Sequence, residues 1–242
     1  MESRESKCVI VTGGSRGIGT GIVRRFRAAG ATVFFTYFSR AEAARELEAE
    51  TGATAVRLDL GAPSDVDALF DTVRDSQGGF DIVVNNAAVL NPFSAVSDVT
   101  DEDFAFVMDG NLRGSFLILR RAARDLRDNG RIINISTLDT SHASAGNALY
   151  AASKAAVEQL VAGIAQEVGS RGITANTVSP GATDTPRLRS NRSEEILAGA
   201  AKATPLGRLG NPDDIADVVA FLASEQGRWI TGQNIRATGG LG

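Results

Sequence analysis

The sequence predicts an α/β protein: a Rossmann-like, doubly wound parallel sheet with helices on both faces, formed by a single domain. Short apolar runs rich in branched residues alternate with amphipathic segments along the whole chain. A glycine-rich turn directly follows the first run, and no linker or shift in composition divides the 242 residues. Because strands joined through helices pair in parallel, we expect one dinucleotide-binding and catalytic domain over residues 1–242.

The first half of the chain is expected to hold four strands separated by three helices. The runs at 8–12, 31–37, 55–58 and 80–84 are short and apolar, which is typical of buried strands. A first helix follows the glycine-rich turn, because apolar residues recur at helical spacing between 22 and 29. A second helix is expected at 42–50, and Ser64 is placed to cap a third.

The second half continues the alternation. Thr100 is predicted to cap a long helix, because the residues that follow it fit a capping box. Strands are expected at 131–135, 173–178 and 230–236, with a helix at 150–168 between the first two. Asn211 and Pro212 are typical of the start of a helix, here expected to run through residue 222. The stretch 181–192 has no periodicity, and 181–210 is expected to be a mobile loop region beside the substrate.

Composition excludes several classes of function. There are 25 basic and 29 acidic residues, a net charge of −4, so no basic surface for nucleic acid is expected. Cys8 is the single cysteine, which excludes internal disulfides and favours a reducing compartment. No signal peptide or membrane-spanning run is evident, so we expect a cytoplasmic protein without a membrane partner. One cysteine and one histidine, His142, cannot build the usual zinc site, and no metal is expected.

The glycine-rich turn, residues 12–19, is the first candidate binding element. Its sequence places glycine at positions 13, 17 and 19, among others, between the first strand and the first helix. Glycine lets main-chain N–H groups approach a diphosphate at the N-terminus of a helix, where the helix dipole favours an anion. The alternative is a turn that only allows the strand and helix to pack closely. No Lys-Ser/Thr pair follows, so the turn is not a P-loop.

Tyr150 and Lys154 are the candidate catalytic pair. They are four residues apart on a predicted helix and so share one face. A phenol has a pKa near about 10 and exchanges protons poorly at neutral pH. A nearby ammonium is expected to lower that pKa and allow Tyr150 to protonate an alkoxide or deprotonate an alcohol. The alternative is a surface lysine beside a tyrosine with no chemical role.

The residues after the second strand indicate which nicotinamide cofactor binds. An acid at this position would hold the 2′-hydroxyl of NAD, but no Asp or Glu occurs before Glu42. Instead Ser39 and Arg40 follow the strand, and Arg16 lies in the glycine turn. Two guanidinium groups suit a 2′-phosphate, so NADP(H) is expected in preference to NAD(H). Alternatively, Arg40 points into solvent.

Several motifs together resemble the short-chain dehydrogenase/reductase family, over essentially the whole chain. The turn is similar to the family's Thr-Gly-x-x-x-Gly-x-Gly, and Tyr150 with Lys154 matches its Tyr-x-x-x-Lys. Residues 85–88, 179–183, 205–208 and 230–240 also resemble family motifs. Ala88 replaces a family glycine, and its methyl should be tolerated if φ there is negative. The pattern is most similar to 3-oxoacyl-(acyl-carrier-protein) reductases.

The resemblance implies roles for further residues. Thr137 stands where the family has a serine that hydrogen-bonds the substrate oxygen, and Ser136 next to it should face the other way along the strand. Asn111, flanked by Gly110 and Gly114, would disturb its helix and hold a water that serves Lys154. Asp59 would bond the adenine amino group. Taken together, the expected cofactor contacts are Gly13, Ser15, Arg16, Gly17, Ile18, Gly19, Ser39, Arg40, Asp59, Leu60, Asn86, Ala87, Tyr150, Lys154, Pro180, Gly181 and Thr183.

The resulting hypothesis is an NADP(H)-dependent oxidoreductase that reduces a ketone to a secondary alcohol, with 3-oxoacyl thioesters as candidates. Catalysis is assigned to Asn111, Thr137, Tyr150 and Lys154. The alternatives are an alcohol, sugar or steroid dehydrogenase working oxidatively, and a sensor that binds NADP(H) without catalysis. His142 is either a solvated loop residue or a substrate contact. Likewise, Arg187, Arg189 and Arg192 either contact an acidic group or form a solvated loop surface. By the resemblance, the helices carrying Asn111 and Tyr150 pair between subunits, which predicts a homo-oligomer, most simply a tetramer.

Overall fold

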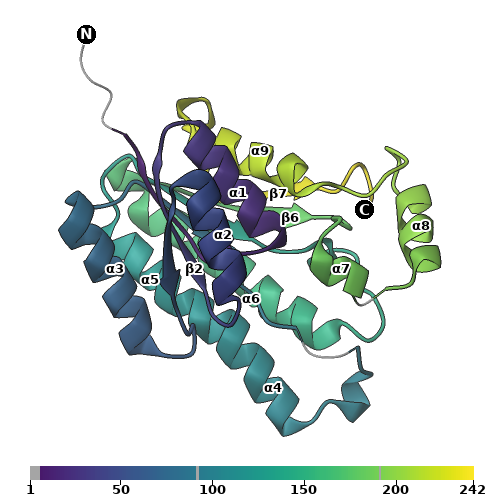
Figure 1. Cartoon of the computed structure of the whole chain (residues 1–242). Helices are drawn as coiled ribbons and strands as arrows, with labels where there is room; N and C mark the ends of the chain where they lie inside the picture. Colours follow the sequence, from purple (N-terminus) through teal and green to yellow (C-terminus); the bar gives the residue numbers. More distant parts are fainter. Residues whose placement is uncertain (1–5, 91–92, 191) are drawn as a thin grey trace.

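The seven strands form one parallel sheet in a computed structural model that describes residues 6–90, 93–190 and 192–242. The spatial order is β3-β2-β1-β4-β5-β6-β7. The strands are β1 (Cys8–Val11), β2 (Thr32–Tyr37), β3 (Thr54–Arg57), β4 (Ile82–Asn85), β5 (Arg131–Ile135), β6 (Thr174–Pro180) and β7 (Asn234–Ala237). Figure 1 shows helices in front of and behind this sheet, so the predicted fold class is confirmed.

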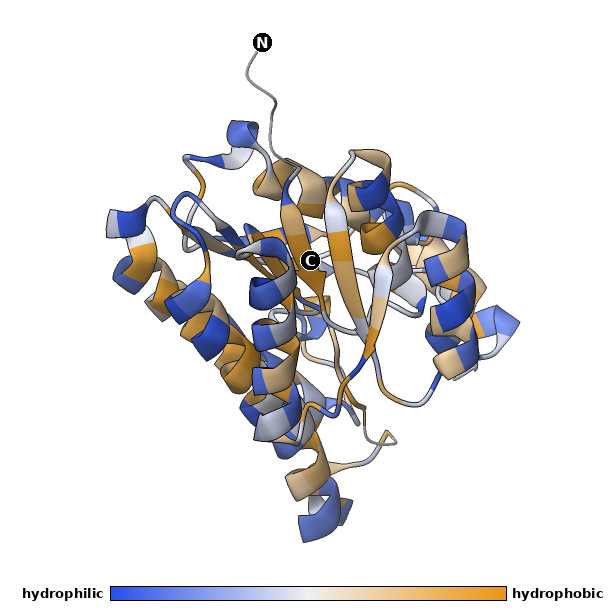
Figure 2. Ribbon diagram, turned by 60° about the vertical axis from the view of Figure 1, so that its left-hand side comes forward, coloured by the Kyte–Doolittle hydropathy of each residue, from blue (hydrophilic) through white to orange (hydrophobic). Residues whose placement is uncertain are grey.

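Helices cover both faces because central strands such as β1 and β4 carry buried apolar side chains on both sides. Val9 and Val11 of β1 pack toward α1 (Gly17–Ala28), α2 (Ala41–Thr51) and α9 (Pro212–Ala223). Cys8 and Ile10 pack toward α3 (Pro63–Gln77), α5 (Gly114–Asp125) and α6 (Ala148–Val168). Figure 2 shows the apolar strands enclosed by helices whose outer surfaces are polar.

The strand order fixes where a ligand can bind. β1 lies between β2 and β4, so the chain leaves β1 toward one edge of the sheet and later returns to start the other half. The connections on the two sides of this point run over opposite faces of the sheet and leave a crevice at the carboxyl ends of the strands. The glycine-rich turn after β1 lies at this crevice.

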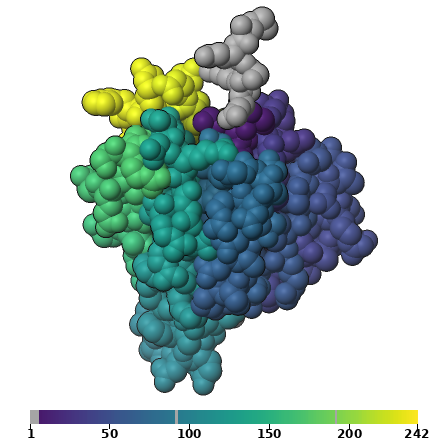
Figure 3. Space-filling model, turned by 90° about the vertical axis from the view of Figure 1, so that its left-hand side faces the viewer, coloured from purple at the N-terminus to yellow at the C-terminus, as the bar shows by residue number. Residues whose placement is uncertain are grey.

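The helix that carries Asn111 is interrupted, as its flanking glycines predict. A π-helical segment, η2 (Met108–Arg113), separates α4 (Asp101–Val107) from α5. A Cβ on Gly110 would stand 2.6 Å from a methyl of Val89, so only glycine lets this segment approach the loop after β4. In Figure 3, α4 projects from the body of the molecule at the bottom of the view.

Helix starts agree with the capping patterns in two of three cases. Thr100 accepts a hydrogen bond from the backbone N–H of Asp103 at 3.1 Å, and Asn211 forms a capping box with Asp214. The prediction for Ser64 was wrong, because α3 begins one residue earlier at Pro63 and Ala62 is its N-cap. Proline has no N–H to satisfy, so it takes the first helical position readily.

The region 181–192 is more regular than the sequence predicts. It contains the short helix α7 (Pro186–Ser190), and α8 (Glu194–Ala203) follows it. The start of α8 carried a signal, since Ser193 caps it and two glutamates occupy its first turn. Residue 191 lies outside the described residues. The last strand, β7, begins at Asn234 rather than at Ile230. The backbone N–H of Ile230 instead donates to the oxygen of Gly227, in the 3₁₀ turn over Glu225–Gly227. No helix in the described part of the chain is long and apolar enough to cross a membrane.

Candidate active site

A cavity of about 930 Å³ opens at the carboxyl ends of the strands. Its volume lies within the range of about 300–1,000 Å³ that is usual for ligand sites. It brings together the glycine turn, the end of β2, the loops after β4 and β5, the start of α6 and the segment after β6. Every residue expected to bind cofactor lines this cavity, as do Thr137, Tyr150 and Lys154. Asn111 does not line it.

The glycine turn is tied to the end of β4. Gly13 has φ +67°, and a Cβ there would stand 2.9 Å from the Cα of Ala87. The Thr12 hydroxyl accepts hydrogen bonds from the N–H groups of Asn86 and Ala87 at 2.9 and 3.0 Å. The Asn86 amide in turn donates to the backbone oxygens of Thr12 and Gly13. The turn is therefore rigid before any ligand binds.

Helix α1 presents an uncapped N-terminus at this turn. Its N-cap residue, Arg16, makes no side-chain cap, and no acidic residue stands in the first turn. The first N–H groups of a helix lack partners within it, and the helix dipole makes this end attractive to anions. Gly19 keeps the backbone close, because a Cβ there would lie 2.2 Å from the oxygen of Gly13. The geometry suits a diphosphate.

Two guanidinium groups act on each other in the part of the cavity beside the end of β2. Burial lowers the pKa of Arg16, and the positive charge of Arg40 lowers it further. Both residues line the cavity together with Ser39 and Asp59. A phosphate placed between two arginines would relieve their repulsion and accept their hydrogen bonds.

Tyr150 and Lys154 face the cavity from α6, and their surroundings shift both pKa values. Burial raises the pKa of Tyr150 to about 12, while the charge of Arg187 lowers it and that of Asp139 raises it. Burial, followed by the charge of Arg187, lowers the pKa of Lys154 to about 8. The Lys154 ammonium donates to the backbone oxygen of Ile135 at 2.7 Å.

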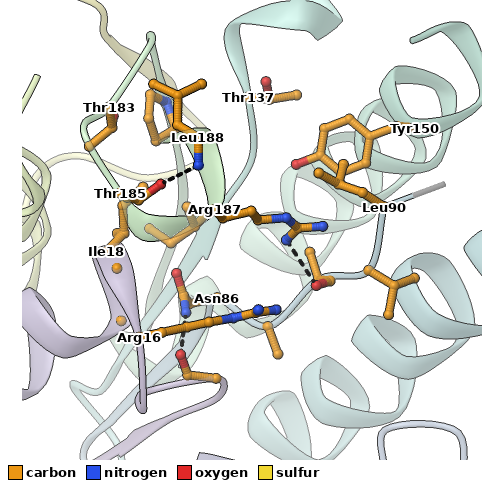
Figure 4. Close-up of a pocket in the computed structure, with 18 of the residues that line it drawn as sticks. Arg16, Ile18, Asn86, Leu90, Thr137, Tyr150, Thr183, Thr185, Arg187 and Leu188 are labelled. Atoms are coloured by element: carbon orange, nitrogen blue, oxygen red, sulfur yellow. Dashed lines mark hydrogen bonds between the residues drawn. The ribbon is translucent and has the colours of Figure 1, made fainter. Parts of the chain in front are cut away.

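The expected electrostatic role of Lys154 is therefore wrong in one respect. Desolvation dominates, so the pKa of Tyr150 is raised rather than lowered, and the cation that opposes this rise is Arg187. A phenol with this pKa is protonated at neutral pH. It is placed to donate a proton, and Figure 4 shows its oxygen pointing into the cavity.

Thr137 and Ser136 face opposite ways, as alternation along β5 predicts. Thr137 lines the cavity, and its hydroxyl donates to a carboxylate oxygen of Asp139 at 3.3 Å and accepts from the Asp139 N–H at 3.3 Å. The Ser136 hydroxyl instead donates a short hydrogen bond to Glu158 of α6. Both residues line the cavity, but the Ser136 hydroxyl is turned toward α6, so the assignment of the substrate contact to Thr137 stays a prediction.

Asn111 acts behind the cavity wall. It is 1% exposed, and its amide exchanges two hydrogen bonds with the backbone of Val89. The same amide donates to the Ser153 hydroxyl of α6 at 3.0 Å. Asn111 therefore joins the loop after β4 to the helix that carries Tyr150 and Lys154. Ala88, in the same loop, does not have positive φ, which satisfies the condition for replacing glycine there.

Asp139 and Thr185 were not singled out from the sequence, and Arg187 was considered there only as part of an arginine cluster that contacts either an acidic group or solvent. Asp139 receives hydrogen bonds from Ser144 and from Asn147. Thr185 accepts one from the N–H of Leu188 at 3.2 Å, at the start of α7. Arg187 reaches across the cavity to the backbone oxygen of Ala88 (Figure 4). The only available signal was their position in loops after β5 and β6, where sites of this fold gather.

His142 and the acidic residues complete the set of candidates. His142 is exposed, as expected of a solvated loop residue, and it also lines the cavity, so its part as a substrate contact stays a prediction. Among the described residues, no group of three or more His, Cys, Asp or Glu side chains could hold a metal ion.

Comparison with known proteins gives the family. Residues 13–242 match the family model described as enoyl-(acyl carrier protein) reductase. A short-chain type dehydrogenase/reductase of Picea abies is 37% identical, covering 97% of this chain and 92% of the relative. The 3-oxoacyl-[acyl-carrier-protein] reductase FabG of Vibrio cholerae is 36% identical, covering 98% of both. The crystal structure of the angucycline C-6 ketoreductase LanV with bound NADP is 40% identical with a TM-score of 0.87, covering 97% of this chain and 95% of that chain. The chain therefore belongs to the short-chain dehydrogenase/reductase family of oxidoreductases.

Proposed function

We propose that this protein is an NADP(H)-dependent carbonyl reductase that converts a ketone to a secondary alcohol. The observation that carries the proposal is the place of the Tyr150 phenol: its oxygen points into the cavity, which Thr137 and Lys154 also line. A proton donor of this kind is what a carbonyl oxygen needs as it becomes an alkoxide. The Vibrio cholerae relative makes 3-oxoacyl thioesters candidate substrates.

The cofactor site fits NADP(H) on structural grounds. The rigid glycine turn and the uncapped N-terminus of α1 suit the diphosphate. Arg16 and Arg40, whose charges repel each other, suit the 2′-phosphate, with Ser39 beside them. The NADP named in the LanV structure agrees with this assignment. The remaining contacts expected from the sequence, from Asp59 to Thr183, line the same cavity and are proposed to hold the rest of the cofactor.

When bound, the nicotinamide cofactor supplies a hydride to the carbonyl carbon. Thr137 orients the carbonyl oxygen with its hydroxyl, and Tyr150 donates its proton to that oxygen as the negative charge develops. Lys154 holds the nicotinamide ribose, and its ammonium lies close enough to Ile135 to be fixed in direction. Asn111 is a positioning residue, because it holds α6 and the loop after β4 rather than touching the cavity.

The test is a substrate panel followed by the absorbance of NADPH. It contains 3-oxoacyl thioesters, diketones and quinones, with a 2-enoyl thioester and a set of alcohols with NADP⁺ as further arms. We expect consumption of NADPH with at least one carbonyl compound, and loss of that activity in Tyr150→Phe without loss of NADPH binding. Activity confined to the enoyl thioester or to the alcohols contradicts the proposed reaction. Binding of NADPH without turnover on the whole panel would favour a sensor.

We further propose that the protein is a homo-oligomer, most simply a tetramer. A groove between α5 and α6 is lined by Leu112, Phe116 and Leu160, and the Phe116 side chain is exposed. At the other end of the chain Trp229 is 96% exposed, next to the start of β7. Two separate apolar surfaces allow two kinds of contact, which a tetramer with more than one symmetry axis uses. Light scattering on the eluted protein gives the mass, and a monomer would refute the proposal.

A further inference from the structure

Arg187 places a cation inside the catalytic cavity. Figure 4 shows its side chain extending from α7 toward Tyr150 and Leu90. Its Nη1 donates to the backbone oxygen of Ala88 at 3.2 Å, which fixes the direction of the guanidinium group. A carbonyl oxygen is neutral, so this contact orients the cation without cancelling its charge.

The charge of Arg187 acts on the catalytic pair. Apart from burial, it is the largest influence on the pKa of both Tyr150 and Lys154, and it lowers both. Burial lowers the pKa of Arg187 itself, the charge of Tyr150 would raise it and that of Arg16 lowers it. The guanidinium group thus lies in the desolvated part of the cavity, near the position that the reacting carbonyl must occupy.

The cavity that Arg187 enters is also lined by apolar side chains, among them Leu90 and Leu188, and by two further charged groups that have contacts of their own. Arg192 lies over the ring of Phe93 at 4.0 Å, and both residues line the cavity. The carboxylate of Asp139 accepts hydrogen bonds from Ser144 at 3.0 Å and from Asn147 at 2.5 Å. These contacts favour a ligand that combines an apolar body with one negative charge, since an arginine binds a carboxylate through paired hydrogen bonds.

We propose that Arg187 recognises an anionic group on the substrate, so that this enzyme reduces oxo acids in preference to neutral ketones. The inference rests on the proposed carbonyl reduction and names the substrate class for the same site. The other source of an anion is the cofactor. Its phosphates are provided for by the N-terminus of α1 and by Arg16 with Arg40, whereas Arg187 reaches toward Tyr150.

The experiment compares acids with their esters. Phenylglyoxylate, benzoylacetate and 3-benzoylpropionate place a carboxylate one, two and three bonds from the ketone carbon, and each is paired with its methyl ester. Wild-type protein, Arg187→Met, Arg187→Lys and Arg189→Met are assayed with NADPH, and the Kd for NADPH is measured by fluorescence. Arg189 is the matched control, because it lies in the same helix but is exposed and pairs with Asp184 and Glu194.

We expect wild-type protein to prefer at least one acid over its ester. Arg187→Met should lower kcat/KM for that acid by about 10- to 100-fold more than for its ester, as loss of a charged hydrogen bond does. The effect of Arg187 on the pKa values of Tyr150 and Lys154 acts on both substrates alike, so the ratio of the two kcat/KM values isolates the contact with the carboxylate. Arg187→Lys should recover part of the loss, and Arg189→Met should behave as wild type. The Kd for NADPH should stay unchanged in Arg187→Met.

Three outcomes would overturn the inference. One is reduction of the esters or of other neutral ketones with no preference for any acid. Another is an equal loss on acid and ester in Arg187→Met, which indicates a structural role. A third is weakened NADPH binding in that variant, which assigns Arg187 to the cofactor phosphates. If no carbonyl compound is reduced at all, the proposed function itself fails, and this result is distinct from the other three.

Discussion

The side chain of Asn111 pairs with the backbone of Val89 in both directions. Its Oδ1 accepts from the Val89 N–H at 2.8 Å, and its Nδ2 donates to the Val89 oxygen at 3.0 Å. Asn111→Ala leaves the N–H and oxygen of Val89 without the buried side-chain amide that they bond, which should lower the free energy of unfolding by about 2–3 kcal/mol. Ser153→Ala removes only one further contact of the same amide and should cost about 1 kcal/mol. Urea unfolding measures both values, and equal costs in the two variants would contradict this account.

Thr137 and Ser136 offer the most direct test of which hydroxyl contacts the substrate oxygen. Thr137→Ala should lower kcat/KM for the best carbonyl substrate by about 100-fold or more, because it removes a hydrogen bond to the developing alkoxide. Ser136→Ala leaves the cavity intact and removes a bond to Glu158, so it should affect stability more than turnover. Steady-state kinetics on both variants decide the matter. The reverse order of effects on kcat/KM would assign the substrate contact to Ser136.

Carbonyl reduction should weaken as the pH rises through about 8. Burial lowers the pKa of Lys154 to about 8, so the group is charged below this pH and neutral above it. Tyr150 does not cause this decline in kcat/KM, because its pKa is raised to about 12 and its phenol stays protonated. The measurement is kcat/KM against pH from about 6 to 10. In Lys154→Arg the side chain stays charged, so the decline in kcat/KM near pH 8 should disappear. If the decline persists, another group causes it.

Cys8 should be inert in the folded protein. Its thiol is buried in β1, 2% exposed, and burial raises its pKa to about 12. Only the thiolate reacts quickly with disulfide reagents, so both access and ionisation prevent modification. An aromatic disulfide reagent should release no chromophore from native protein and one equivalent from protein unfolded in guanidinium. Fast labelling of the native protein would contradict the buried position of Cys8.

Arg121 should contribute more to stability than any exposed arginine near it. It is 3% exposed and makes ion pairs with Asp67, Asp71 and Asp125, which join α3 to α5. Arg121→Met leaves these carboxylates without their shared cation and should cost about 2–3 kcal/mol, below the value for fully buried pairs because the acids are partly exposed. Arg124→Met is the matched control and should unfold as wild-type protein does, because Arg124 is exposed. Thermal unfolding of both variants is the measurement, and equal shifts would contradict the role of Arg121.

The sheet could be predicted because its signal is local. Each buried strand is a short apolar run, and β5 was predicted with its bounds unchanged. The cavity wall was also predictable in large part, since short motifs at the carboxyl ends of strands converge wherever the sheet is parallel. Capping patterns set the starts of α4 and α9 for the same reason: a cap involves residues only three apart.

What the sequence could not reveal depends on burial and on contacts between distant segments. The raised pKa of Tyr150 follows from desolvation, which residue spacing does not report. The place of Arg187 in the cavity follows from how α7 packs, because the residue it contacts, Ala88, is 99 positions away. The mobility expected for 181–210 stays a prediction, and hydrogen exchange on that segment measures it.

The bonds that tie Thr12 to the loop after β4 also set when the site exists during folding. Thr12 and Asn86 are 74 residues apart, and Arg187 reaches its partner over a longer separation still. Contacts between such distant residues form late in folding, because a long stretch of chain must lose conformational entropy before the contact can stabilise it. A newly made chain therefore lacks its binding pocket until β6 has paired in the sheet and α7 has packed against the loop after β4. Once complete, the pocket couples nucleotide affinity to the stability of the whole sheet, so the bound ligand should raise the melting temperature.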